Sequence, residues 1–324
     1  GVSLLGVKGR QARTTQVPYA AVFRSSVGRE GDTGGRRAAQ RLPARRSRRR
    51  SPAMPARGSA RWTPTPRVCP SIQAGDLDPR AFKEEFVIPA KPVIIHGAME
   101  TWGALQRWPD PEYLPRVFQD KQLPPAGNAV SGSMAEFCRD LFVGGEKAKG
   151  YLERPITRNG APAILGEVAG DIEIPPFFDP APHLASKIFA GWNSRCSVHY
   201  HPSAEATLSQ VTGRKRGLLF PTTGRDLGHL YPYRWLSRSF SFSKLEFHRD
   251  GSWPDLGEFP RLAQSRPIEV VLDPGDMLYI PIYWWHVFFG QEGSMSVTNL
   301  WMASLRKRYF CRMGLRSNYV NARL

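Results

Sequence analysis

The stretch between residues 185 and 302 is built from short β-prone segments separated by turn signals. The segments are rich in β-branched and aromatic residues, and the turns include Thr212-Gly213 and Asp273-Pro274-Gly275-Asp276. Many short strands in succession favour an antiparallel β-sandwich or a barrel, so we predict a mainly β fold with its barrel core at about 185–303. The expected strands lie near residues 185–192, 196–201, 206–212, 214–220, 267–272, 277–282, 285–290 and 294–302.

The residues before this stretch predict a helical N-terminal part. Residues 92–97, PVIIHG, are typical of a buried strand, and residues 143–184, rich in Gly and Pro, are expected to be loop, as is the excursion 221–266. Three helix starts are indicated by capping residues, followed by proline or by a glutamate three positions on. They are Asp78-Pro79 with a helix through Phe86, Asp110-Pro111, and Ser133 with Glu136.

The first 67 residues differ in composition from the rest of the chain. They hold 16 of the 45 Lys and Arg residues but only two of the 28 acidic residues, and so carry +14 of the net charge of +17. A basic segment without hydrophobic periodicity cannot bury enough apolar surface to fold, and we expect residues 1–67 to be a disordered arm. Three interpretations stay open: a targeting signal, a nucleic-acid-contacting tail, or a solvated extension.

Residues 68–305 are long enough for one domain with a large core, followed by a basic tail at 306–324. The four cysteines are scattered without a CxxC pair, which argues against a disulfide framework or a cysteine zinc site and suits a reducing compartment. The chain has no apolar run of 18 residues, so we expect no membrane span. These features predict a nuclear or cytoplasmic protein, with an organelle transit peptide as the open alternative.

His199 and His201 stand two residues apart in a segment with strand character. Side chains at i and i+2 of a strand share one face, about 7 Å apart along the backbone, so the two imidazoles are suited to hold a metal. His286 follows the aromatic pair Trp284-Trp285 near the start of a later strand. A third histidine there would close a three-point metal site that leaves open positions for substrate and O₂.

From about Phe82 to Trp301 the chain resembles the JmjC cupin-type oxygenases, most of all the small hydroxylase-type members. The order and spacing of QVTGRKR-LLFP and PGDMLYIP-x-x-WWH are the most specific part of the likeness. The matching segments are PVIIHGA (92–98) with Trp102 and Trp108, SVHYHPSAEATLSQVTGRKRGLLFP (197–221), HLYP (229–232), FPRLAQSRPIEVVLDPGDMLYIPIYWWHVF (259–288) and SVTNLW (296–301).

This resemblance implies a double-stranded β-helix, a jelly-roll barrel, that holds Fe(II) and uses 2-oxoglutarate and O₂ to hydroxylate a C–H bond. His199 falls on the family's first iron ligand and His286 on its last. Lys215 matches the lysine that pairs with the distal carboxylate of 2-oxoglutarate, and a carboxylate partner would offset the cost of placing a cation in a barrel. Asn299 matches a polar position of the final core strand that lines the iron pocket.

His201 departs from the family pattern, in which Asp or Glu supplies a negative charge to the iron. Three outcomes stay open: a metal site of His199, His201 and His286 alone; recruitment of Glu205, which would give the ligand set of the wider cupin superfamily; or a degenerate site with little metal affinity. The corresponding functions are a 2-oxoglutarate-dependent hydroxylase, a cupin metalloprotein that does not use 2-oxoglutarate, and a non-catalytic binding module.

The resemblance makes a protein side chain the first expectation for the substrate and a modified RNA base the second. Specificity in such a fold lies in the loops around the barrel mouth, here 143–184 and 221–266, and neither loop contains a motif for a particular ligand. The sequence leaves the oligomeric state open.

Overall fold

The computed structural model describes residues 64–125, 130–144, 150–175, 177, 181–221, 227–233 and 239–308. Almost all of the basic arm and most of the C-terminal tail therefore lie outside the described residues. Within the described part, no helix is long and apolar enough to cross a membrane.

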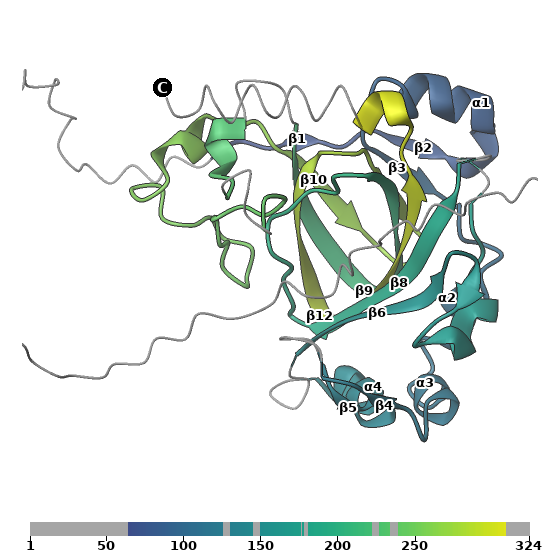
Figure 1. Ribbon diagram of the computed structural model, residues 1–324. Helices are drawn as coiled ribbons and strands as arrows, with labels where there is room; N and C mark the ends of the chain where they lie inside the picture. The colour runs from purple at the N-terminus through teal and green to yellow at the C-terminus, as the bar shows by residue number, and fades with distance from the viewer. Residues whose placement is uncertain are drawn as a thin grey trace, which may run out of the picture.

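The described chain forms a ten-stranded sheet that curls around a common interior (Figure 1). The order along its main path is β2-β3-β11-β9-β12-β8-β6-β7, with β10 paired to β9 and to β1. This architecture is the predicted mainly β barrel of the jelly-roll type. The strands are β1 Arg67–Val68, β2 Ser71–Gln73, β3 Val93–His96, β6 Tyr151–Arg158, β7 Ala161–Pro162, β8 His183–Trp192, β9 Ala204–Phe220, β10 Ile268–Leu272, β11 Met277–Ile280 and β12 Trp285–Met302; β4 Gln122–Leu123 and β5 Gly132–Ser133 form a separate pair.

Two long antiparallel strands, β9 and β12, form the centre of the sheet. They pair from Trp285 opposite Phe220 to Met302 opposite Ala204, with irregular register between Gln291 and Ser296. The prediction of two shorter strands in each region is wrong, because Gly213 bends β9 without ending it. Gly213 has φ +64°, and a Cβ there would lie 2.7 Å from the carbonyl oxygen of Gly293, so glycine is needed at this bend.

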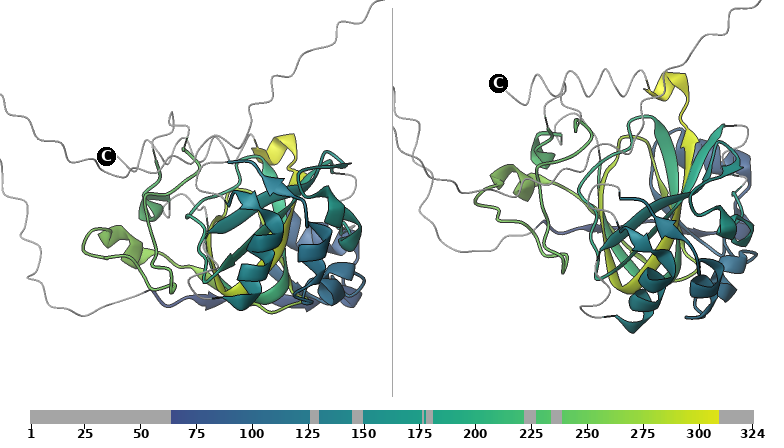
Figure 2. Two further views of the ribbon diagram at one scale, coloured as in Figure 1. Left: turned by 90° about the horizontal axis from the view of Figure 1, so that it is seen from below. Right: turned by 60° about the horizontal axis from the view of Figure 1, so that its bottom comes forward.

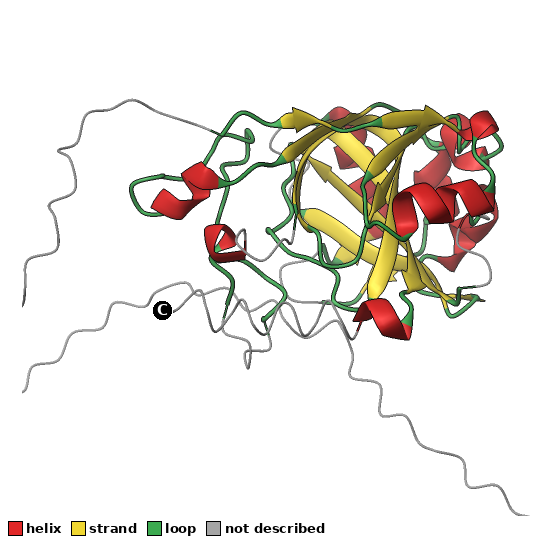
Figure 3. Cartoon of the chain, turned by 90° about the horizontal axis from the view of Figure 1, so that it is seen from above, coloured by secondary structure: helices red, strands yellow, loops and turns green. Residues whose placement is uncertain are grey.

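Among the described residues, the α-helices lie along the right and lower sides of the barrel in Figure 1, and Figure 3 shows the helices in red beside the strands. Their predicted starts are confirmed at two caps: the Asp78 carboxylate accepts from the backbone N–H of Arg80 at 2.7 Å, and the Ser133 hydroxyl accepts from Glu136 N–H at 3.2 Å. The α-helices are α1 Pro79–Phe82, α2 Gly103–Arg107, α3 Tyr113–Val117 and α4 Met134–Val143. The described residues also form short helical turns at η1 Ala74–Asp76, η2 Lys83–Val87, η4 Gly166–Asp171, η6 Leu227–Leu230 and η7 Pro260–Gln264, and residues 305–308 are helical.

A large apolar cluster joins these helices to the outer face of the barrel. Its buried members include Trp102, Trp108 and Phe118 from the helical part and Tyr279 and Trp301 from the strands. A second cluster, which includes Tyr200, Leu218 and Phe247, packs the 239–266 segment on another side of the barrel, as the two further views show (Figure 2). The interior is filled by a third cluster that includes Leu208, Leu219 and Phe288. The barrel wall is thus packed with apolar side chains on both faces.

The expectation of loop throughout 143–184 is wrong, because this segment contains strand β6. β6 pairs antiparallel with β8 on one side and, among the described strands, with the two-residue β7 on the other. Its sequence, YLERPITR, hides the strand, since Pro155 and two charged residues interrupt the pattern. Proline is tolerated near a sheet edge at an irregularity, and the β6–β8 register shifts between Pro155 and Thr157.

Candidate metal centre

Three histidine side chains converge at one end of the barrel. The metal-binding nitrogen atoms of His199, His201 and His286 all lie within 4.8 Å of one another. The ring centroids are 4.3 Å apart for His199 and His286, 4.9 Å for His201 and His286, and 5.5 Å for His199 and His201. The structure therefore brings together all three histidines that the sequence singled out.

His286 stands at the start of β12, whereas the two other histidines belong to the loop after β8. The expected strand at 196–201 is wrong: His199 forms isolated bridges to His286 and Phe242. The His199 N–H donates to the His286 carbonyl at 3.1 Å, and the His286 N–H donates to the His199 carbonyl at 2.8 Å. This reciprocal pair fixes the two rings side by side without a continuous strand.

Backbone carbonyls orient two of the three imidazoles. Nδ1 of His199 lies 2.8 Å from the Ser197 carbonyl oxygen, and Nδ1 of His286 lies 2.9 Å from the Trp284 carbonyl oxygen. A carbonyl only accepts, so Nδ1 carries the proton and the Nε2 lone pair is left for a metal. Nδ1 of His201 is buried and has no hydrogen-bond partner among the described residues.

The electrostatics of the histidines favour the neutral form that binds metal. Burial lowers the pKa of His199, and it lowers the pKa of His201 and His286 to well below the ordinary value. The neighbouring histidines lower the pKa of His286 further. Three neutral, convergent imidazole nitrogens suit a first-row divalent metal such as Fe(II), so the residues fit the metal that the family resemblance implies.

Lys215 projects from the same wall of the barrel as His286. It lies opposite Gly290 in the β9–β12 ladder, four residues before Leu219, which lies opposite His286. Its exposed fraction is 2%, and Nζ donates to the hydroxyl of Ser296. No carboxylate contacts Lys215 among the described residues. A buried cation without an anion is costly, so this position suits a ligand carboxylate, as 2-oxoglutarate would supply.

The burial of Lys215 makes the free energy of unfolding depend on pH. Desolvation lowers the pKa of Lys215 to about 8, and the nearby Cys196 opposes that shift in part. Between about pH 8 and the ordinary lysine value near 10.5, the unfolded chain holds a proton that the folded chain has released. The free energy of unfolding of the ligand-free protein should therefore rise with pH across this window, by about 3 kcal/mol from this group. Denaturant unfolding of wild type and Lys215→Met at several pH values measures it, and parallel pH curves for the two proteins would contradict it.

Further polar residues of the interior were missed from the sequence. Lys187 on β8 forms an ion pair with Glu153 on β6, at 2.8 Å between Nζ and Oε1. The charge of Lys187 lowers the pKa of both His199 and His201, which places this pair beside the metal centre. Tyr151, also on β6, is half-buried. Desolvation raises its pKa well above the ordinary value, and Cys196 and Glu153 add to that shift. Alternation along β6 would have revealed these residues had the strand been recognised.

The structure does not bring Glu205 into the histidine group. Its Oε2 accepts from Tyr279 Oη at 2.8 Å and from Ile282 N–H at 2.9 Å, and its Oε1 is 2.7 Å from Lys307 Nζ. Both carboxylate oxygens therefore have other partners.

The structure also keeps Asn299 apart from the histidines. Asn299 is fully buried, and its Oδ1 accepts from the Ser186 hydroxyl at 2.6 Å. Ser296, which contacts Lys215, faces the interior, and Asn299 lies three positions further along β12. An odd offset in a strand reverses the face, so Asn299 points toward the helical layer.

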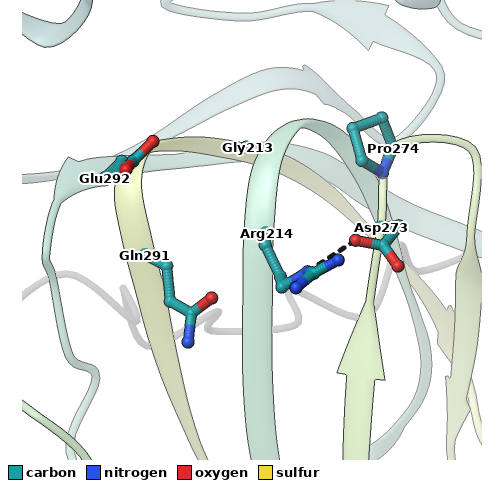
Figure 4. Close-up of a pocket in the computed structure, with 6 residues that line it drawn as sticks. All are labelled: Gly213, Arg214, Asp273, Pro274, Gln291 and Glu292. Carbon is teal, nitrogen blue, oxygen red and sulfur yellow. Dashed lines mark hydrogen bonds and ion pairs between the residues drawn. The ribbon is translucent and has the colours of Figure 1, made fainter.

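A surface hollow lies where β9, β10 and β12 turn, and Figure 4 shows the residues that line it. Arg214 and Asp273 form an ion pair at 2.7 Å across it. Arg214 neighbours Lys215 and so projects from the opposite face of β9, away from the histidines. We assign no chemistry to this hollow.

These features define a β-barrel protein with three convergent histidines that could hold a metal and an interior cation suited to a carboxylate. Residues 79–305 match the family of cupin-like domains, and the chain belongs to that family, as the JmjC resemblance indicated. Similar curated proteins include lysine-specific demethylase 8 of Xenopus tropicalis, 26% identical over 254 residues, which cover 72% of this chain and 51% of that protein. Lysine-specific demethylase JMJ30 of Arabidopsis thaliana is 27% identical over 239 residues, covering 69% of this chain and 53% of the relative.

A second kind of relative is the tRNA wybutosine-synthesizing protein 5 of Danio rerio, 31% identical over 136 residues, which cover 42% of this chain and 38% of that protein. The chain spans about half the length of the two demethylases. The names of these relatives therefore refer to two kinds of substrate, lysine in the demethylases and tRNA in the wybutosine-synthesizing protein.

Proposed function

We propose that this chain is an Fe(II)- and 2-oxoglutarate-dependent oxygenase of the JmjC type that hydroxylates a protein side chain. The observation that carries the proposal is the placement of Lys215 on the wall that also holds His286, as a buried cation that no carboxylate of the described residues contacts. A metal centre alone would not require such a cation, whereas a bound dicarboxylate would pair with it.

In this proposal His199, His201 and His286 hold the iron, and Lys215 and Ser296 bind the distal carboxylate of 2-oxoglutarate. The bound metal and cosubstrate would supply the oxidation of a C–H bond by O₂. Lys215 fixes the direction in which 2-oxoglutarate enters, because its Nζ is held by Ser296. Phe242, whose ring stacks on that of His199 with centroids 5.5 Å apart, shields the ligand from water.

A protein side chain is the proposed substrate, and a modified RNA base is the second candidate. The names of the demethylase relatives support the first, and that of the tRNA wybutosine-synthesizing protein supports the second. The low identities leave the particular substrate to experiment. Because both carboxylate oxygens of Glu205 have other partners, the contacts disfavour a four-ligand cupin centre that includes it.

A non-catalytic binding module remains the competing function, and His201 is the observation that favours it. An imidazole there removes the negative charge that the family's carboxylate gives to the metal. Within the described part of the chain, its Nδ1 has no acceptor of the kind that orients the two other rings.

Purified, iron-reconstituted protein should consume 2-oxoglutarate above the level of a His199→Ala control, because the control loses a ligand that the structure orients through Ser197. Succinate formation under air measures the turnover. Wild type that carries one iron per chain yet matches the control would overturn the proposal. Turnover that is absent in wild type but gained in His201→Asp would identify the protein as a module disabled by its own histidine.

A further inference from the structure

The turn between β11 and β12, residues 281–284, touches two of the three histidines. The Tyr283 N–H donates to the His201 carbonyl at 3.1 Å, and the Trp284 carbonyl is the acceptor that orients His286. Tyr283 has φ +66°, in the left-handed region that a bulky residue avoids. Such a conformation persists only when its surroundings impose it, so the turn needs restraint from outside.

That restraint comes from Glu205 and from the last described residues, 305–308, which are helical. Glu205 Oε2 accepts from Ile282 N–H at 2.9 Å, and Lys307 Nζ lies 2.7 Å from Glu205 Oε1. The Tyr283 hydroxyl donates to the carbonyl of Arg308 at 3.1 Å. Residues 305–308 therefore reach the turn by two arms, one from Lys307 through Glu205 to Ile282 and one from Arg308 to Tyr283. Lys307 also donates to the Val87 carbonyl, which joins the helical part to the same point.

The yellow helical turn in Figure 1 is this segment, and it sits at the end of the barrel next to β3 and α1. The Glu205 side chain is 5% exposed and that of Lys307 is 18% exposed. A carboxylate this deeply buried is stable only with its counter-charge, since removing one partner leaves an uncompensated charge. Loss of Lys307 would therefore leave the carboxylate without its counter-charge. Its Oε2 would keep the hydrogen bonds from Tyr279 Oη at 2.8 Å and from Ile282 N–H at 2.9 Å, but the uncompensated charge would weaken its hold on the turn.

We propose that residues 305–308 form a latch that positions the turn 281–284 beside the three histidines, with Lys307 and Glu205 as its positioning residues. The latch rests on the proposed function, since it acts on the metal centre described above. Its path is short: Lys307 holds Glu205, Glu205 holds Ile282, and the turn holds the His201 backbone and the His286 ring. Neither Lys307 nor Glu205 contacts the metal in this arrangement.

Co(II) binding to the full chain tests the latch, because the visible spectrum of Co(II) reports both affinity and ligand geometry. Lys307→Met and Glu205→Gln should each weaken Co(II) binding by about 10- to 100-fold, the range for residues that orient metal ligands, and should change the spectrum. Tyr283→Phe removes the second arm and should give a smaller change of the same kind. The double variant Lys307→Met/Glu205→Gln should bind no more weakly than the poorer single variant, because both act through one contact.

Lys121→Met is the matched control, since Lys121 forms an ion pair with Glu167 in the helical layer. It should leave the Co(II) affinity and spectrum unchanged, and Lys307→Arg should restore most of the affinity. Lower thermal stability with unchanged Co(II) affinity and spectrum in Lys307→Met would overturn the latch. So would loss of Co(II) binding in Glu205→Gln alone, since Glu205 would then be a ligand. Wild type that binds no Co(II) would instead refute the proposed function and the latch with it.

Discussion

Replacing Lys215 by methionine is expected to make the ligand-free protein more stable at neutral pH and to abolish its stabilisation by 2-oxoglutarate. Methionine fills a similar volume without charge, and replacing a buried ionic group with an apolar one is often stabilising by about 1–4 kcal/mol. The same change removes the cation that would pair with the ligand carboxylate, at a cost of about 2–5 kcal/mol in binding. Thermal unfolding with and without 2-oxoglutarate, in the presence of Mn(II), measures both effects.

Lys187→Met provides the contrast for this experiment. Lys187 is also an interior lysine, but its partner Glu153 would be left without its counter-charge, so the ligand-free protein should lose stability. Opposite signs for the two variants would support the distinction between a paired cation and one that awaits a ligand. A Lys215→Met protein that 2-oxoglutarate stabilises as strongly as it does wild type would remove Lys215 from the binding site.

Replacing His286 by alanine is expected to weaken divalent-metal binding by at least 100-fold. Changing a residue that merely orients a ligand costs about 10- to 100-fold, and loss of the ligand itself should exceed that. His286 contributes a ring held at 2.9 Å by the Trp284 carbonyl, and its centroid lies closest to that of His199. Metal content after dialysis against a weak chelator, together with a Co(II) titration, measures the loss.

His96→Ala is the matched control for this substitution. His96 lies in β3, with Nδ1 2.6 Å from the Asp276 carboxylate, and is not part of the histidine group. Its removal should therefore leave metal binding unchanged. Equal metal content in His286→Ala and wild type would show that the three convergent rings are not the metal centre.

Local sequence signals were enough for the helix starts and most of the strands. Asp78 and Ser133 cap helices because their side chains accept from N–H groups two or three residues away, which is a property of a few adjacent residues. Strand β6 was not predicted because Pro155 interrupts the short alternation of apolar and polar residues along it. Its pairing with β8 joins residues about 30 positions apart, and no local signal encodes such a contact.

Some residues of the candidate site could be placed from the sequence, and others only from the folded structure. The bend at Gly213 reverses the alternation of β9, so that Lys215 faces the interior whereas Glu205, at an even offset from it, faces the helical layer. Uninterrupted alternation would have put both residues on one face. For Asn299 the signal was available, because its odd distance from His286 along β12 already predicts the opposite face.

The sequence by itself determined the β-rich barrel and singled out the three histidines, because strand-forming residue types and histidine spacing are local properties. Lys215 was singled out by the resemblance to the JmjC family, and it faces the interior because of the bend at Gly213. The tertiary structure alone decided that Nδ1 of His201 has no orienting acceptor among the residues that the structure describes, that Lys187 is paired with Glu153, and that Glu205 contacts Lys307. The two ion pairs, Lys187 with Glu153 and Lys307 with Glu205, join residues that lie far apart in the sequence. Their geometry depends on strand register and bulges, which only the folded chain specifies.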